Sequence, residues 1–245
     1  RGNWRPQLSV AAQVMTAAAI DLRGYGESTL GPHPSSIDSY CEDIRAVADH
    51  FAAQRIVLIG LSYGAWIATS FALRHPEYMA GLVICGGCTG MSEAAEGERH
   101  AFRAAREVPL NNGQTPADFA PAVIDVIAGP NCSTSVRSEL LHSMAAIAAA
   151  TYRDALNCFT HPTEQFDLGQ LACPCLAMTG EFDKLAPPAE IQAVAERMGK
   201  RAKAKGWPDV TFEVIPGAGH VANLENESFY NTELSGFLDR VGDIY

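Results

Sequence analysis

One strand-turn-helix pattern decides the fold of this chain. It is the stretch Ile56-Val57-Leu58-Ile59-Gly60-Leu61-Ser62-Tyr63-Gly64-Ala65-Trp66-Ile67-Ala68. A short apolar run bounded by a glycine predicts a buried strand, and the apolar residues after Gly64 recur at helical spacing. Between them, Gly60-x-Ser62-x-Gly64 predicts a tight turn that lifts the Ser62 hydroxyl above the end of the strand. The alternative is an ordinary glycine-rich turn with a structural serine, because so short a motif also occurs by chance.

The composition indicates a globular protein with an acidic surface. The 245 residues are 47% hydrophobic and 19% charged, with a formal net charge of −10. This length suits one large α/β domain with a small insertion. The negative charge argues against nucleic acid and anionic membranes as partners. We find no apolar run long enough to span a membrane and no signal-peptide pattern, although the chain begins at Arg1, and we expect a cytoplasmic protein.

The seven cysteines form an odd number and lie mostly in apolar contexts, which is typical of free thiols in a reducing compartment. Two short spacings, Cys85-Gly-Gly-Cys88 and Cys173-Pro-Cys175, raise the alternative of a metal or redox site. The first follows a strand-like run rather than opening a helix, and the second has a spacing that zinc sites rarely use. We therefore favour buried thiols and expect no metal.

The first third of the chain alternates between helical and strand patterns. Apolar spacing predicts a helix within residues 1–12, a strand over 13–20, a helix over 36–51 capped by Ser36, and a strand over 81–87. Residues 21–28, Asp21-Leu22-Arg23-Gly24-Tyr25-Gly26-Glu27-Ser28, predict a structural turn in which the glycines adopt positive φ. A substrate-binding role for Arg23 is the alternative.

Residues 89–168 differ from the rest because strand signals are nearly absent. The segment is rich in alanine and is punctuated by Pro109, Asn111-Asn112-Gly113, Pro116, Pro121, Gly129-Pro130 and His161-Pro162. We interpret it as a helical cap inserted between a first core segment, 1–88, and a second, 169–245. Apolar cap residues either line a substrate pocket or only hold the cap together. They are Val136, Leu140, Leu141, Met144 and Ile147.

The last third returns to alternating strands and helices. The pattern predicts strands over 171–178 and 210–215, helices over 188–198 and 228–241, and a polar surface loop over 199–206. The ends of the two strands lead into Thr179-Gly180-Glu181-Phe182-Asp183 and Pro216-Gly217-Ala218-Gly219-His220.

A serine hydroxyl needs a base, and the base needs an orienting carboxylate. The sequence places Ser62, Asp183 and His220 after three different strands. The carboxyl ends of parallel strands share one edge of a sheet, so these residues can converge. Glu181 is the competing acid, and a structural loop histidine is the alternative for His220. The order serine, acid, histidine is the order used by α/β-hydrolases.

The whole chain resembles the α/β-hydrolase superfamily, a mostly parallel sheet flanked by helices with a helical cap. Gly60-Leu61-Ser62-Tyr63-Gly64 and Val214-Ile215-Pro216-Gly217-Ala218-Gly219-His220-Val221-Ala222-Asn223-Leu224-Glu225 are most similar to 3-oxoadipate enol-lactonase-like hydrolases and related esterases. The resemblance places the acid at Asp183. We expect an oxyanion donor at the Tyr63 N–H, in the turn after Ser62, and substrate-pocket positions at Trp66, Met144 and Val221. Position 62 is serine, which separates this chain from relatives of the same fold that use an aspartate nucleophile.

The resemblance implies a serine hydrolase that cleaves a small carboxylic ester or lactone without a metal or organic cofactor. Two alternatives stay open: a C–C bond hydrolase, and a catalytically weak relative that binds a small molecule as a signalling module. The family pattern normally has further strands before Asp21, and their last loop supplies a second oxyanion donor. We therefore expect a fragment, unusual boundaries or strands from another chain, and weak activity if that donor is absent.

Overall fold

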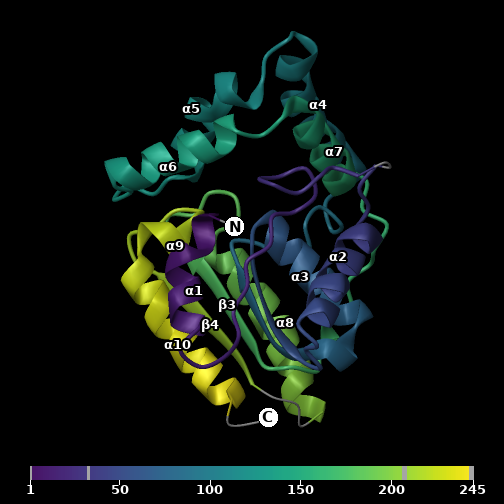
Figure 1. The fold of residues 1–245 in the computed structure, drawn as a ribbon, viewed down its shortest axis with the longest axis vertical. Coiled ribbons are helices and arrows are strands. Elements are labelled where there is room, and N and C mark those ends of the chain that lie inside the picture. The colour runs from purple at the N-terminus through teal and green to yellow at the C-terminus, as the bar shows by residue number, and fades with distance from the viewer. Residues whose placement is uncertain (1, 32–33, 206–208, 243–245) are drawn as a thin grey trace.

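The computed structural model describes residues 2–31, 34–205 and 209–242, and within them it contains one sheet of four strands (Figure 1). The strands are β1 (Ile56–Leu61), β2 (Met79–Cys85), β3 (Cys175–Gly180) and β4 (Val210–Ile215). They lie in the order β1-β2-β3-β4, and each pair is parallel. The sheet predicted from the sequence is therefore confirmed, and its carboxyl ends share one edge.

Burial distinguishes the central strands from the outer ones. Every residue of β2 and of β3 is buried, whereas β1 and β4 consist mainly of half-buried residues. Continuous apolar runs such as Leu82-Val83-Ile84-Cys85 are what a strand covered on both faces requires.

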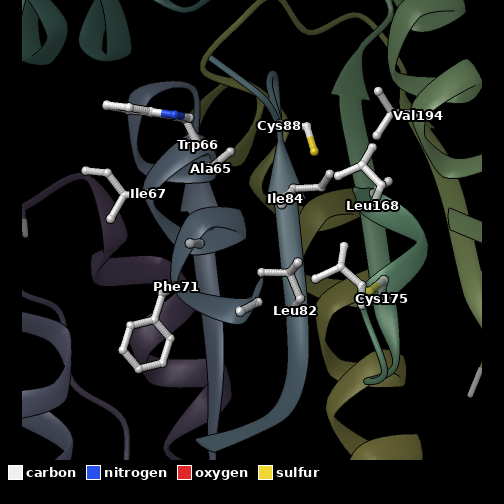
Figure 2. Packing of buried hydrophobic residues seen from close by; sticks show 14 of the residues in the cluster. Ala65, Trp66, Ile67, Phe71, Leu82, Ile84, Cys88, Leu168, Cys175 and Val194 are labelled. Carbon is white, nitrogen blue, oxygen red and sulfur yellow. The ribbon is translucent and has the colours of Figure 1, made fainter. Parts of the chain in front are cut away.

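Helices cover both faces of the sheet and bury alternate residues of each strand (Figures 1 and 2). One layer holds α2 (Ile37–His50), α3 (Tyr63–Arg74) and α8 (Pro188–Lys205), and the other holds α1 (Arg5–Ala11) and α10 (Glu227–Gly242). Leu82 and Ile84 face the first layer, as Figure 2 shows, while Val83 and Cys85 face the second. This alternation is the period of two that a strand imposes.

Residues 89–168 contain only helices and connecting turns. The helices are α4 (Glu96–Asn111), α5 (Pro116–Ile127), α6 (Thr134–Ala145) and α7 (Ala149–Thr160). They pack as two pairs, α4 with α7 and α5 with α6, beyond the carboxyl edge of the sheet (Figure 1). The remaining short elements are η1 (Gly2–Trp4), η2 (Pro76–Tyr78), η3 (Leu168–Gln170) and α9 (Ala222–Glu225).

The predicted strand over 13–20 is wrong. Residues 16–22 have no regular secondary structure, but side chains in this region alternate as a strand's would, with Met15 and Ala17 packed against one core cluster and Ile20 and Leu22 against the other. However, β1 pairs with β2 and the described part of 13–20 forms no ladder. Alternation only determines which side chains are buried, and a strand also needs a hydrogen-bonded neighbour.

A cavity of about 400 Å³ borders this segment. It is lined by Gly2, Arg5, Leu8, Ala19, Asp21 and Gly26.

Three further boundaries differ from the sequence expectations. The surface loop expected from Gly199 is wrong up to Lys205, because α8 continues through it; residue 206 lies outside the described residues. Lysine, arginine and alanine are strong helix formers, which outweighs one glycine. Pro109 and Pro121 lie inside α4 and α5 rather than between helices. Strand β3 begins only at Cys175, four residues later than expected.

Several expected properties can be compared with the described residues. All seven cysteines are free, and six of them are buried, which agrees with the interpretation as core thiols. The part of the chain that is described holds no cluster of three or more candidate metal ligands. No described helix combines the length and apolarity needed to cross a membrane.

Candidate active site

Ser62 occupies the sharp turn between β1 and α3. Its backbone has φ +54° and ψ −116°, a conformation that residues with a side chain rarely adopt. Such strain costs about 1–3 kcal/mol and persists only where the surrounding structure imposes it. A Cβ atom on Gly60 would lie 2.3 Å from the Gly64 carbonyl oxygen, so the turn closes only with glycine at position 60. The strand-turn-helix prediction is thereby confirmed in its local geometry.

Tyr63 is the first residue of α3, so its N–H lies in the first helical turn, where intrahelical acceptors are lacking. Its phenol packs against the rings of Tyr40, Trp66 and Phe159. The Tyr63 hydroxyl lies 3.2 Å from the Tyr40 hydroxyl. Burial, followed by the neighbouring Tyr40, raises the pKa of Tyr63 well above its usual range. The side chain therefore stays neutral, with its hydroxyl directed to Tyr40. The oxyanion role of the Tyr63 N–H stays a prediction.

Asp183 lies in the loop after β3 and is 4% exposed. Its Oδ1 accepts hydrogen bonds from the N–H groups of Leu185 (2.8 Å) and Ala186 (2.9 Å). Its Oδ2 lies 2.8 Å from Nδ1 of His220. Two backbone donors on one oxygen fix the carboxylate, so that the other oxygen faces the imidazole.

His220 follows β4 by one glycine-rich turn and is 5% exposed. Because Asp183 accepts at Nδ1, the hydrogen-bond network assigns the proton to that atom. The Nε2 atom is then left as an acceptor, which is the tautomer that a general base requires.

The three predicted residues converge on the segment that ends β2. The Ser62 N–H donates to the Cys85 carbonyl oxygen at 2.8 Å. A Cβ on Gly86 would lie 3.1 Å from the His220 ring and 3.2 Å from Oδ2 of Asp183, and a Cβ on Gly87 would lie 3.3 Å from the Ser62 carbonyl oxygen. Both glycines have positive φ. They let the backbone after β2 lie close to both Ser62 and the His220–Asp183 pair.

Glu181, the competing acid, is directed elsewhere. Its Oε2 accepts a hydrogen bond from the Gly217 N–H at 2.9 Å, and the residue is exposed. The structure therefore brings Asp183, and not Glu181, to the imidazole of His220. Glu181 instead ties the loop after β3 to the loop after β4.

The three predicted pocket residues lie in different surroundings. Trp66 is 1% exposed, and its Nε1 donates to Oε1 of Glu164 at 2.5 Å. Val221 is buried against residues of α5 and α6. Met144 is half-buried near the end of α6. Trp66 and Val221 are thus occupied in packing the helical segment onto the core, and the pocket role of all three stays a prediction.

Arg23 has a structural partner. Its guanidinium binds both carboxylate oxygens of Asp43 in α2, at 2.6 and 2.9 Å, and donates to the Ser39 carbonyl oxygen. Gly24 and Gly26 have φ of +76° and +54°, as the turn prediction requires. This geometry favours the architectural interpretation of the turn.

Sequence reasoning missed the contacts made by Gly86, Gly87, Gly129 and Glu225. A Gly-Gly pair directly after a buried strand was the available signal for the first two. No local signal marks Gly129 and Glu225, whose N–H and carboxylate meet across 96 residues of chain.

Known proteins resemble this chain over most of its length. A profile of the alpha/beta hydrolase family matches residues 2–232. The chain is 22% identical to 3-oxoadipate enol-lactonase 2 of Acinetobacter baylyi, over 97% of this chain and 84% of that protein. It is 27% identical to 2-succinyl-6-hydroxy-2,4-cyclohexadiene-1-carboxylate synthase of Serratia proteamaculans, over 91% and 83%.

The similarity extends to solved structures. A thermophilic esterase from Thermogutta terrifontis superposes with a TM-score of 0.82 at 25% identity, covering 99% of this chain and 86% of the esterase. The family profile spans the strained serine turn, both candidate acids and the buried histidine, and it leaves unmatched only residue 1 and residues 233–245. The chain therefore belongs to the alpha/beta hydrolase family.

Proposed function

We propose that this protein is a serine hydrolase that cleaves a small carboxylic ester or lactone through an acyl-enzyme. The observation that carries the proposal is the buried His220–Asp183 hydrogen bond, held against the same Gly86-Gly87 segment that contacts Ser62. The names of the relatives, an enol-lactonase and an esterase, support this substrate class.

Each residue has one role in the proposed cycle. Ser62 Oγ attacks the substrate carbonyl carbon while Nε2 of His220 takes its proton. The developing oxyanion accepts a hydrogen bond from the Tyr63 N–H, near the positive end of α3. Asp183 holds the imidazole in the required tautomer and stabilises its positive charge.

The intermediate collapses, and the leaving oxygen takes the proton from His220. Water then attacks the acyl-enzyme as His220 takes a proton from it, and His220 returns that proton to Ser62 Oγ as the acid is released. For a lactone, the leaving oxygen remains part of the acyl group, so this second step releases a single ring-opened acid. The same residues serve both substrate types.

We also propose that helices α4–α7 act as the cap of the site. The two helix pairs pack against different parts of the core. In the α4–α7 pair, Cys158 and Phe159 of α7 pack with Trp66 of α3. The α5–α6 pair packs on Val221, the residue after His220. A substrate that reaches Ser62 would therefore meet both pairs.

The test is labelling with a fluorophosphonate probe followed by peptide mapping. We expect modification at Ser62 that is lost in Ser62→Ala and in His220→Ala. The matched control is Ser70→Ala, which removes a buried α3 hydroxyl that has no hydrogen-bond partner among the described residues. That variant should label like the wild type.

Turnover of p-nitrophenyl acetate and of a small enol-lactone then separates the substrate classes. Absence of labelling in folded wild-type protein would contradict the proposal and favour the small-molecule binding module. Labelling without turnover of any ester or lactone would contradict the substrate class alone.

A further inference from the structure

The backbone of His220 is held by the helical segment and not only by the core. Its N–H donates to the carbonyl oxygen of Ile127 at 2.7 Å. Ile127 is the last residue of α5, so its carbonyl oxygen has no donor within the helix. The backbone N–H of the candidate base supplies that donor instead.

Backbone packing next to this hydrogen bond is unusually close. A Cβ on Gly219 would lie 2.4 Å from both the Gly129 nitrogen and the Ile127 carbonyl oxygen. A Cβ on Gly129 would lie 2.5 Å from the Gly219 nitrogen. Real Cβ contacts are not this short, so both positions require glycine and the two backbones touch directly.

One carboxylate joins the two segments. Oε2 of Glu225, in α9, accepts a hydrogen bond from the Gly129 N–H at 2.6 Å. Its Oε1 accepts from the Val221 N–H at 3.3 Å. Glu225 thus joins Gly129, which follows α5, to Val221, which follows His220. Both hydrogen bonds are charge-assisted, because the acceptor is a carboxylate.

An apolar cluster packs beside these hydrogen bonds, between the α5–α6 pair and the loop of His220. Val221 is buried with Ile124 and Ala128 of the α5 region and with Leu140 of α6, and Leu61, the residue before Ser62, packs against this group. The α5–α6 pair, which lies over α9 in Figure 1, therefore contacts the neighbours of both Ser62 and His220.

We propose that Glu225 is a positioning residue for His220, acting by locking the α5–α6 pair onto the loop that carries the histidine. This inference rests on the proposed role of His220 as the general base. With Glu225 in place, the α5–α6 pair is held in one position beside the site. An imidazole that loses this backbone support leaves the reach of Ser62, and small misplacements of a catalytic group can cost about 100-fold in rate.

The kinetic test compares Glu225→Ala and Glu225→Gln with the control Glu227→Gln, which neutralises an exposed carboxylate two residues away. For p-nitrophenyl acetate we expect kcat to fall about 10–100-fold in Glu225→Ala with KM changed less than about threefold. Glu225→Gln should lose less, because its amide oxygen still accepts one N–H. Glu227→Gln should match the wild type. Wild-type kcat in folded Glu225→Ala overturns the proposal, as does a rise in KM alone.

Amide hydrogen exchange tests the lock without relying on turnover. The His220 and Gly129 amides should exchange at least about tenfold faster in Glu225→Ala than in wild type or Glu227→Gln. Unchanged exchange at both amides overturns the proposal. If Glu225→Ala does not fold, Glu225→Gln carries both comparisons. Wild-type protein that fails to label at Ser62 contradicts the proposed function, whereas the exchange experiment still decides whether Glu225 holds the histidine loop.

Discussion

Nδ1 of His220 lies 2.8 Å from Oδ2 of Asp183, and both side chains are almost fully buried. The competing acid, Glu181, is only two residues away in the chain but bonds the Gly217 N–H instead. The loop after β3 therefore directs Asp183 to the imidazole, as the resemblance implies, and directs Glu181 to a different partner.

Replacing the two acids should have unequal effects. In Asp183→Asn the amide N–H₂ can face Nδ1 and favour the histidine tautomer that cannot accept the Ser62 proton. We expect kcat for p-nitrophenyl acetate to fall about 10³–10⁴-fold. Glu181→Gln should stay within about threefold of the wild type. A larger loss in Glu181→Gln than in Asp183→Asn would show that the acid is misassigned.

The two glycines of the serine turn should differ in their tolerance of alanine. A Cβ at position 60 meets the Gly64 carbonyl oxygen at 2.3 Å, whereas a Cβ at position 64 has no atom within 4 Å. Gly60→Ala should lower the free energy of unfolding by about 1–3 kcal/mol or prevent folding. Gly64→Ala should be neutral or stabilising by up to about 1 kcal/mol, because alanine favours the helix. Urea unfolding measures both, and equal destabilisation would contradict the steric argument.

Arg23 should affect stability and not substrate affinity. Its two hydrogen bonds to Asp43 are lost in Arg23→Ala, and we expect a loss of about 1 kcal/mol in unfolding free energy. Asp43→Asn should lose a similar amount, because it weakens the same pair. KM for the ester should stay within about twofold in both. A rise in KM confined to Arg23→Ala would support the substrate-binding alternative.

The thiols should react in two classes. Six cysteines are buried, and burial raises the pKa of Cys41 and Cys88 to about 12. Cys41 and Cys88 therefore remain protonated at pH 8, and burial shields the six thiols from the reagent. Cys132 alone is half-buried, so a disulfide reagent should modify one thiol quickly in the native protein and seven in denaturant.

The rate at Cys132 should rise with pH, because burial raises the pKa of this thiol and the thiolate is the reactive form. Cys132→Ser should remove the fast reaction. Any fast thiol that remains in that variant would contradict the burial assignment.

The helices and most of the strands could be predicted because their signals are local. The capping box of α2, in which Ser36 Oγ accepts from the Ser39 N–H, and the continuous apolar run of β2 need no information from distant residues. For residues 13–20, local signals predicted a strand that does not form. Their side chains alternate as predicted, but a strand is defined by backbone partners, and alternation does not supply them.

The sequence by itself determined the strand-turn-helix around Ser62 and the parallel direction of the strands. It also placed Ser62, Asp183 and His220 at one edge of the sheet. These follow from short-range sterics and from the direction that parallel strands share. The resemblance favoured Asp183 over Glu181, and the tertiary structure showed that Asp183 meets the imidazole. Only the tertiary structure decided that Gly86 lies against the His220–Asp183 pair, that Gly87 lies against Ser62, and that Glu225 bonds Gly129. Such contacts join residues far apart in the chain, and their geometry is set by how the loops and helices pack.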